Sequence, residues 1–271
     1  MAVEASGKNP IEYIQHHLNN WAVGSGVTGI NLDTILFSVL IGGLVVLLAW
    51  RVGKRISVDR PGRVQSFLEL VVTFVNQQVR DAFPVKDPFI GPLALTIFVW
   101  VLLMNAMDLI PVDLLPRIAQ WVGMGFGLDP HHVYLRVLPT ADVSTPFALA
   151  LSIFVLTMIY GLRHRGLGGT FKHYLTHPYG PWMAPFNLAM SILDELARPL
   201  SLALRLWGNM FAGELIFMLI ALFGFSLVAA PGQVALGWMW SWFETLIIIL
   251  QAFIFMLLSV VYLAMTVQQE H

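Results

Sequence analysis

The chain has 271 residues, of which 57% are hydrophobic and 11% charged, with a formal net charge of −1. Soluble domains carry about 25% charged residues, so this composition and the mean hydropathy of +0.73 predict a protein that crosses a membrane several times. No basic patch predicts nucleic-acid binding, and the absence of cysteine excludes disulfides, thiol catalysis and cysteine-based metal sites.

The N-terminal segment, residues 1–31, is polar and lacks the basic-then-apolar order of a cleavable signal peptide. Residues 32–50 follow as a first apolar stretch with the roughly 20 residues that a membrane span needs. Arg51, Lys54 and Arg55 come directly after it. Because loops rich in Lys and Arg stay in the cytoplasm, we expect the N-terminal segment to lie outside.

Residues 63–82 predict an amphipathic helix, because Phe67, Leu70 and Phe74 recur at helical spacing opposite polar side chains such as Glu69. The hydrophobicity of this segment is too low for a membrane span. Two interpretations stay open: a cytoplasmic helix that lies in the membrane surface, or a helix that packs on a partner subunit.

Two further spans are predicted at residues 88–110, running outward, and at residues 143–161, returning inward. The loop between them contains few basic residues, which suits the outer side of the membrane. Arg163, Arg165 and Lys172 then mark a second cytoplasmic loop.

Two long apolar stretches complete the chain, residues 182–227 and 234–267, with a turn predicted at residues 230–232. Both exceed the length of one upright span, so they predict strongly tilted or bent helices. Pro199 lacks a backbone donor and is the expected bend. The predicted fold is therefore an all-α polytopic membrane protein, a single membrane domain with about five membrane-embedded helices, the amphipathic helix, and a cytoplasmic C-terminus.

Arg205 lies inside the first of these long stretches, where a cation costs roughly 2.5–3.5 kcal/mol at mid-membrane. On a helix, Ser201 and Asn209 share its face, whereas Glu214 lies on the opposite face and about 13.5 Å further along. Glu214 is therefore not a simple partner for the guanidinium. Arg205 either forms a structural ion pair that fixes helix packing, or it has a functional role.

Other polar residues also fall within the predicted spans. Asp194 is nearly in phase with the arginine but about 16 Å away along a straight helix. Glu244, Gln251 and Tyr262 share one face of the last helix, and such a stripe should face another helix or an aqueous path. Asn105 and Asp108 lie near a span end, where water is accessible.

No enzyme chemistry is predicted for this chain. It contains no phosphate-binding glycine loop, no serine-hydrolase elbow and no kinase signature. Its histidines are not accompanied by a cluster of other metal ligands. We therefore expect no catalytic site, no bound metal and no cofactor.

The chain resembles the a subunits of bacterial F-type ATP synthases, the ion-channel subunits of the stator. The most specific match is at residues 199–214, whose sequence is PLSLALRLWGNMFAGE. Residues 250–255 with Tyr262 provide a second match, and residues 105–111 and 138–142 fit as well. With a weaker match at the N-terminus, the resemblance covers nearly the whole chain.

This resemblance implies a mechanism. Subunit a lies against a rotating ring of c subunits, and two offset aqueous half-channels reach that interface from opposite sides. Arg205 matches the arginine that keeps each ring carboxylate ionised and blocks direct ion leakage, as expected for a fixed cation. The implied function is ion translocation, most simply of protons, that drives ATP synthesis elsewhere in the complex. The implied location is the bacterial inner membrane with a periplasmic N-terminus, and the implied partners are the c-ring, the b subunits of the peripheral stalk and membrane lipid.

The resemblance also implies roles for single residues. Glu214, Glu244, Asn105, Asp108 and Gln251 take the positions of the outer half-channel, and Asn209 lies near Arg205 at the ring. On the cytoplasmic side the weaker candidates are Ser191, Asp194, Ser201 and Tyr262. Many relatives carry histidine at the position of Glu244, and some carry a carboxylate at that of Ser191. We therefore hypothesise that Glu214 and Glu244 share a proton as a coupled relay.

Two other functions stay open. An ion-coupled secondary transporter also places charges at mid-membrane, but it often shows internal repeats, which are not visible here. A passive assembly anchor would use Arg205 only in an ion pair, so Arg205→Lys would leave ion transport intact.

Overall fold

The computed structural model describes residues 22–23, 30–57, 61–83, 85, 87–110, 114–125, 138–176, 179–223 and 230–267. The regular structure in this part of the chain is helical, apart from the antiparallel two-residue strands β1 (Ala22–Val23) and β2 (Ile30–Asn31). Five of its helices are long and apolar enough to cross a membrane, which confirms the predicted all-α polytopic fold. Most of the predicted outer segment and residues 268–271 lie outside the described residues.

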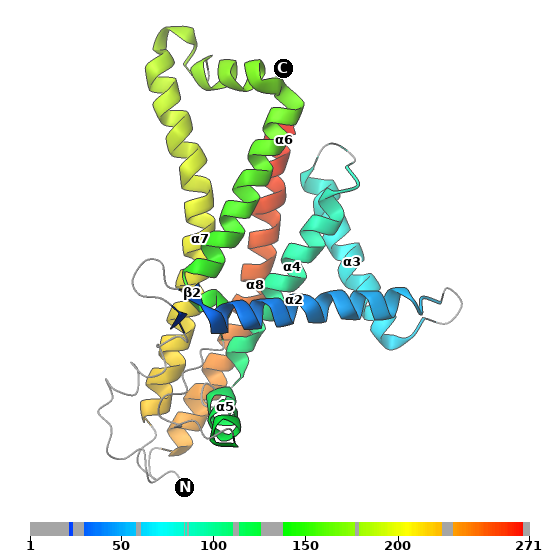
Figure 1. Cartoon of the computed structure of the whole chain (residues 1–271), viewed down its shortest axis with the longest axis vertical. Helices are drawn as coiled ribbons and strands as arrows, with labels where there is room; N and C mark the ends of the chain where they lie inside the picture. The colour runs from blue at the N-terminus through cyan, green and yellow to red at the C-terminus, as the bar shows by residue number, and fades with distance from the viewer. Residues whose placement is uncertain are drawn as a thin grey trace. The chain divides into compact units, whose positions relative to one another are not determined.

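The helices are α2 (Leu32–Gly53), α3 (Arg63–Ala82), α4 (Ile90–Ala106), α5 (Leu114–Gly125), α6 (Ser144–Thr176), α7 (Ala184–Phe223) and α8 (Ala230–Val267) (Figure 1). Three 3₁₀ turns accompany them: η3 (Met107–Leu109), η5 (Pro139–Ala141) and η6 (Pro181–Met183). The chain forms two compact units. Unit 1 contains Met1–Leu48, Trp100–Asp142 and Trp207–Gln251, and unit 2 contains Ala49–Val99, Val143–Leu206 and Ala252–His271.

In unit 1, α2 leaves most of its apolar side chains uncovered by the chain. Val39 and Val46 are 65% and 69% exposed, as expected for a helix that faces lipid. The 22 residues of α2 extend about 33 Å, close to the roughly 30 Å thickness of the hydrocarbon layer. The indole of Trp100, on α4, donates a 3.3 Å hydrogen bond to the carbonyl oxygen of Ser38, which attaches α2 to α4.

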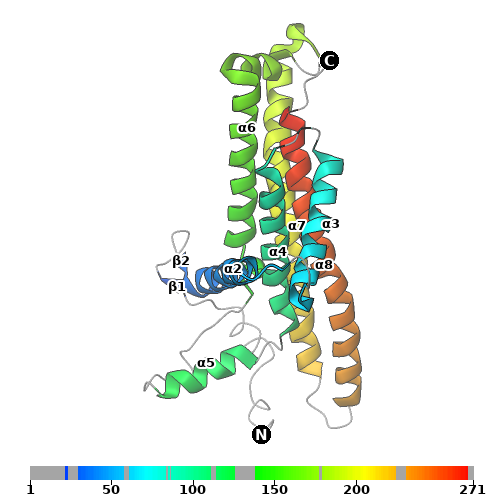
Figure 2. The ribbon, with the colours of Figure 1, turned by 90° about the vertical axis from the view of Figure 1, so that its right-hand side faces the viewer.

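The parts of α7 and α8 in unit 1 lie side by side, and α2 runs across their direction (Figures 1 and 2). The 40 residues of α7 and the 38 of α8 would each extend nearly 60 Å, about twice the hydrocarbon thickness. A helix of that length must tilt strongly or extend beyond the hydrocarbon layer. The helix α7 continues through Pro199.

Three stretches differ from the sequence predictions. The turn predicted at residues 230–232 is wrong, because α8 begins at Ala230 and Pro231 lies in its first turn, where a missing backbone donor costs nothing. The expected second cytoplasmic loop is helical, since α6 continues to Thr176 after changing direction at Gly166, which has φ 70°. The loop expected on the outer side contains α5, which was not predicted.

In unit 2, α3 has the bounds that its amphipathic pattern predicts. The ring of Phe74 lies 6.2 Å from that of Phe98 and 5.8 Å from that of Phe253, so one face of α3 packs on α4 and α8. Phe67 and Leu70 are 65% and 67% exposed. Those exposed side chains suit a membrane surface or a partner subunit, and both interpretations stay open.

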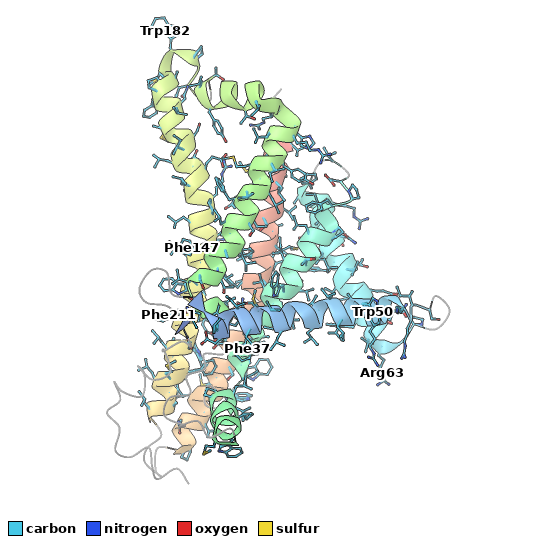
Figure 3. The ribbon with its side chains drawn as sticks, in the orientation of Figure 1. Phe37, Trp50, Arg63, Phe147, Trp182 and Phe211 are labelled. Atoms are coloured by element: carbon cyan, nitrogen blue, oxygen red, sulfur yellow. The ribbon has the colours of Figure 1, made fainter. Side chains whose placement is uncertain are left out.

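Two tryptophans of unit 2 lie near helix ends, and Trp182 projects away from the ribbon (Figure 3). Trp50, in the last turn of α2, is 59% exposed, and Trp182, directly before α7, is 97% exposed. Tryptophan is enriched at both membrane–water interfaces because its ring is apolar and its N–H is polar. These positions therefore suit the boundary between hydrocarbon and headgroups.

Candidate functional site

Three carboxylates from three elements meet inside unit 1. Asp108 lies in η3 directly after α4, Glu214 lies in α7, and Glu244 lies in α8. Asp108 and Glu214 are each 6% exposed, and Glu244 is fully buried. Asp108 interacts electrostatically with both glutamates, most strongly with Glu244. A buried group of this kind can accept, share and release protons.

Gly213 allows two of these carboxylates to approach the backbone of α7. A Cβ atom at this position would lie 2.8 Å from Oε1 of Glu244 and 3.0 Å from Oδ2 of Asp108. The two carboxylate oxygens are therefore less than about 6 Å apart, within the range at which one charge acts on another. Glycine weakens a helix interior by about 1 kcal/mol relative to alanine. At position 213 this cost is offset by the space that it leaves for the carboxylates of Glu244 and Asp108.

Three amide side chains lie on the helices that carry or adjoin the carboxylate cluster: Asn105 on α4, Asn209 on α7 and Gln251 on α8. Asn105 is fully buried one turn before Asp108, and neither of its amide atoms has a hydrogen-bond partner in the described part of the chain. Oδ2 of Asp108 and both oxygens of Glu244 also have no hydrogen-bond partner there. Asn209, on α7, donates a 2.9 Å hydrogen bond to Oε1 of Gln251, which lies two turns after Glu244 on α8. Buried polar atoms that a protein does not satisfy itself are suited to water.

Arg205 lies in the part of α7 that belongs to unit 2, and its side chain is half-buried. Among the described residues it forms no hydrogen bond and no ion pair. Ser201 and Leu204 beside it are exposed, so the arginine belongs to a face of α7 that unit 2 leaves uncovered. A structural ion pair within the described chain is therefore not the role of this cation.

The weaker candidates of the sequence analysis do not form a cluster. Ser191 is half-buried, and Asp194 and Ser201 are exposed. Within the described residues, no hydrogen bond or ion pair joins any of these three to another candidate. Tyr262 is half-buried, with the guanidinium carbon of Arg198 lying 6.0 Å from the centre of its ring.

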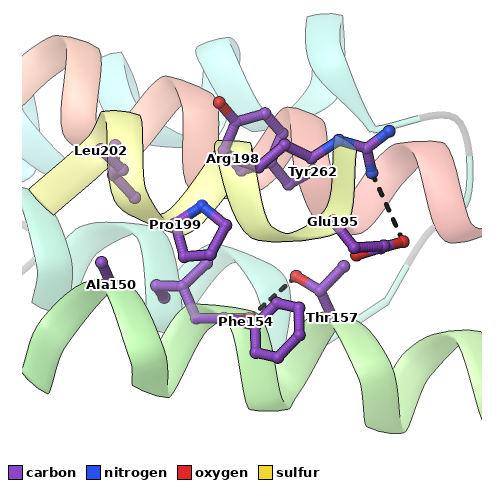
Figure 4. Close-up of a pocket in the computed structure, with 9 residues that line it drawn as sticks. Ala150, Phe154, Thr157, Glu195, Arg198, Pro199, Leu202 and Tyr262 are labelled. Atoms are coloured by element: carbon purple, nitrogen blue, oxygen red, sulfur yellow. Dashed lines mark hydrogen bonds and ion pairs between the residues drawn. The ribbon is translucent and has the colours of Figure 1, made fainter. Parts of the chain in front are cut away.

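Glu195 and Arg198 are charged residues of α7 that the sequence analysis did not select as site candidates. Arg198 Nη1 lies 3.8 Å from Glu195 Oε1 (Figure 4), and both residues line a small cavity of about 10 Å³ with Pro199 and Tyr262. Their spacing of three residues was the available signal, because oppositely charged side chains at that spacing meet on a helix. The hydroxyl of Tyr174 donates to Glu195 at 3.3 Å, a contact that no local spacing indicates.

Comparison with known proteins gives a consistent result. The sequence pattern of the ATP synthase A chain family matches residues 35–264. A protein named ATP synthase subunit a from Idiomarina loihiensis is 49% identical over 267 residues, which cover 97% of this chain and 98% of the relative. Proteins of the same name from Alkalilimnicola ehrlichii and a Marinomonas species are 44% and 46% identical, over 98% and 93% of this chain and 99% and 95% of each relative.

Proposed function

Because the chain belongs to the ATP synthase A chain family, we propose that it conducts protons through two offset half-channels beside a rotating ring of c subunits. Membership makes it a non-catalytic, multi-pass membrane subunit of the part of ATP synthase that couples ion translocation to ATP synthesis. The half-channels and the ring interface are the finer proposal, which the geometry of the polar residues supports.

The observation that carries this proposal is that Arg205 has no anionic partner in the described chain. Its guanidinium cannot lose its proton, and within the described chain it has no anionic partner. A cation on an uncovered face of a membrane helix needs a partner from outside. A carboxylate that each c subunit presents in turn supplies that partner, and the arginine lowers the pKa of each arriving carboxylate so that it releases its proton. The same fixed charge opposes a cation that would pass directly between the half-channels.

For the outer half-channel, we assign Asn105, Asp108, Glu214, Glu244 and Gln251. The buried carboxylates and the unsatisfied amide of Asn105 form a polar interior suited to water and proton exchange. Asn209 is exposed and bonded to the buried Gln251. This contact would connect the ring-facing surface of α7 with the polar interior.

For the cytoplasmic half-channel, we assign Ser191, Asp194, Ser201 and Tyr262. Asp194 and Ser201 are exposed on α7, where water or a neighbouring subunit can reach them. The positive-inside rule places Arg51, Lys54 and Arg55 in the cytoplasm. The N-terminus is then periplasmic in a bacterial inner membrane, the C-terminus is cytoplasmic, and b subunits complete the stator.

The membrane potential supplies the energy for this cycle. One elementary charge that crosses 100 mV releases about 2.3 kcal/mol. This energy drives rotation only if each proton crosses while it is bound to a carboxylate of the ring. A direct path between the half-channels would dissipate the energy as heat. Arg205 therefore affects both how fast protons move and how tightly their movement is coupled to the ring.

Arg205→Lys tests the proposal in the intact ATP synthase reconstituted in vesicles. We expect normal assembly but a severe loss of ATP-driven proton pumping, because lysine is a compact point charge that can lose its proton in a low-dielectric site. Arg163→Lys is the matched control, since Arg163 is exposed on α6, and it should pump normally. Unimpaired pumping by an assembled Arg205→Lys complex would make the chain a passive anchor instead.

A further inference from the structure

A polar cavity of about 100 Å³ lies within unit 2 among α6, α7 and α8. A single water molecule needs about 10–15 Å³ of such space, so this cavity can hold a polyatomic group. Its lining contains two arginines, one carboxylate, and several hydroxyls: Arg165, Arg198, Glu195, Thr157, Thr170, Tyr174 and Thr266.

The helix α6 changes direction beside this cavity. Gly166 has φ 70° and ψ 168°, a backbone conformation that residues other than glycine rarely adopt. Because the chain turns there, Thr157 before the kink and Tyr174 after it line the same space. Side chains from both sides of the kink therefore line the cavity, together with residues of α7 and α8.

The charges in the cavity leave one arginine in excess. Glu195 accepts a hydrogen bond from the hydroxyl of Tyr174 at 3.3 Å and lies 3.8 Å from Arg198. Arg165 donates one N–H to the carbonyl oxygen of Met265 at 3.2 Å and has no ion pair within the described residues. A guanidinium carries five N–H donors, so most of those of Arg165 remain available.

The hydroxyl groups do not neutralise this excess charge. Thr157, Thr170 and Thr266 each donate to a carbonyl of their own helix. Burial, and then the Glu195 carboxylate, raise the pKa of Tyr174 against the opposing effect of the two arginines, so the phenol stays neutral. Hydrogen-bond donors for a ligand therefore come from the guanidiniums, which match phosphate oxygens in geometry and charge.

The cavity lies where the apolar part of α6 gives way to the charged residues Arg163, His164 and Arg165. Leu162 and Leu167 are exposed on α6 around these charges, with 41% and 79% of their surfaces uncovered. Basic pockets between helices at this depth suit anionic lipid headgroups, with neighbouring apolar side chains against the acyl chains. We propose that this cavity binds the phosphate headgroup of an anionic phospholipid through Arg165 and Arg198.

Photocrosslinking in the intact complex tests this site. The probe is phosphatidylglycerol with a photoactivatable group, and the labelled peptides of α6, α7 and α8 are identified by mass spectrometry. Arg165→Gln should lower crosslinking about fivefold, because one basic residue near an anionic surface contributes about 1 kcal/mol to binding. Arg163→Gln, which removes a neighbouring arginine that does not line the cavity, should change it much less.

Competition identifies the source of the phosphate. Unlabelled phosphatidylglycerol should displace the probe, whereas phosphatidylcholine and inorganic phosphate should not. If inorganic phosphate competes equally, the cavity recognises phosphate but the lipid assignment is overturned. Equal labelling of wild type and Arg165→Gln overturns the site itself. Should Arg165→Gln fail to assemble, Arg165→Lys keeps the charge without the planar fork and must still weaken labelling. Because the readout is binding, it does not depend on proton pumping.

Discussion

The amide nitrogen of Asn209 lies 2.9 Å from Oε1 of Gln251 and donates a hydrogen bond to it. Asn209 is exposed on α7, whereas Gln251 is only 3% exposed on α8. The bond thus connects an exposed side chain to the buried polar residues of unit 1. If α7 faces the ring, this contact lies on the path between the ring and the carboxylate cluster.

A double-mutant cycle of Asn209→Ala and Gln251→Ala should show coupling between the two residues. Hydrogen bonds between membrane helices contribute about 0.6 kcal/mol on average, so the double variant should pump protons roughly threefold better than the product of the single effects predicts. ATP-driven pumping in inverted vesicles, normalised to assembled complex, gives the four rates. Strictly multiplicative effects would show that the bond has no role in transport.

Gly213→Ala should impair proton pumping while the helix itself remains stable. The added Cβ would come within 2.8 Å of Glu244 and 3.0 Å of Asp108, and overpacking of this kind typically costs about 1–3 kcal/mol. We expect the carboxylates to move apart and pumping to fall.

Gly237→Ala on α8 is the matched control for this variant. Among the described residues its Cβ would meet only Ile220, at 3.9 Å, an ordinary contact. Gly237→Ala should keep normal pumping and bring the small gain in helix stability that alanine gives. Equal pumping by the two variants would contradict the tight packing of carboxylates against Gly213.

Glu244→Gln should slow proton pumping strongly without loss of assembly. Glu244 is fully buried beside Asp108, and glutamine keeps the size of the side chain but cannot bind and release a proton. A positioned acid or base typically accelerates proton transfer about 10²–10⁴-fold, so a loss of more than tenfold is expected. Glu69→Gln on α3 is the control, because Glu69 lies outside the cluster. Pumping at the wild-type rate would refute the proposed relay of Glu214 and Glu244.

Asn187→Ala should destabilise the connection between α6 and α7. The fully buried Asn187 accepts a hydrogen bond from the backbone N–H of Tyr179 and donates to the carbonyl oxygens of Leu175 and Gly180. Each orphaned buried group costs about 1–3 kcal/mol. Protease sensitivity between α6 and α7 in the purified complex should rise. Asn187→Asp keeps the acceptor for Tyr179 but turns an acceptor oxygen toward the carbonyl oxygens of Leu175 and Gly180, so it should raise cleavage at least as much as alanine. Unchanged cleavage in both variants would contradict this role.

Much of the architecture could be predicted from the sequence, because lipid imposes a simple rule. Backbone polar groups in hydrocarbon must be satisfied internally, so long apolar stretches become helices. The five spans follow from this rule. It does not apply to the polar connections, and there the predictions failed: α5 was missed, and α6 continues to Thr176 because Gly166 redirects the helix instead of ending it.

For the candidate site, the residue types were predictable and their grouping was not. Helical phase separated Arg205 from Glu214, and the structure describes no anionic partner for this arginine. The phase of α8 also placed Glu244 and Gln251 on one face. Phase within single helices could not bring Asp108 to Glu244, since that contact requires two elements to approach each other.

By itself, the sequence determined which residues are apolar enough to enter the membrane and which charge is too costly to be there without a role. Both are local properties of composition and of spacing along one helix. Only the tertiary structure decided that Gly213 admits two carboxylates and that a kink at Gly166 brings Tyr174 to Glu195. Those outcomes depend on how close separate helices come, which side-chain volume and glycine positions set only once the helices pack.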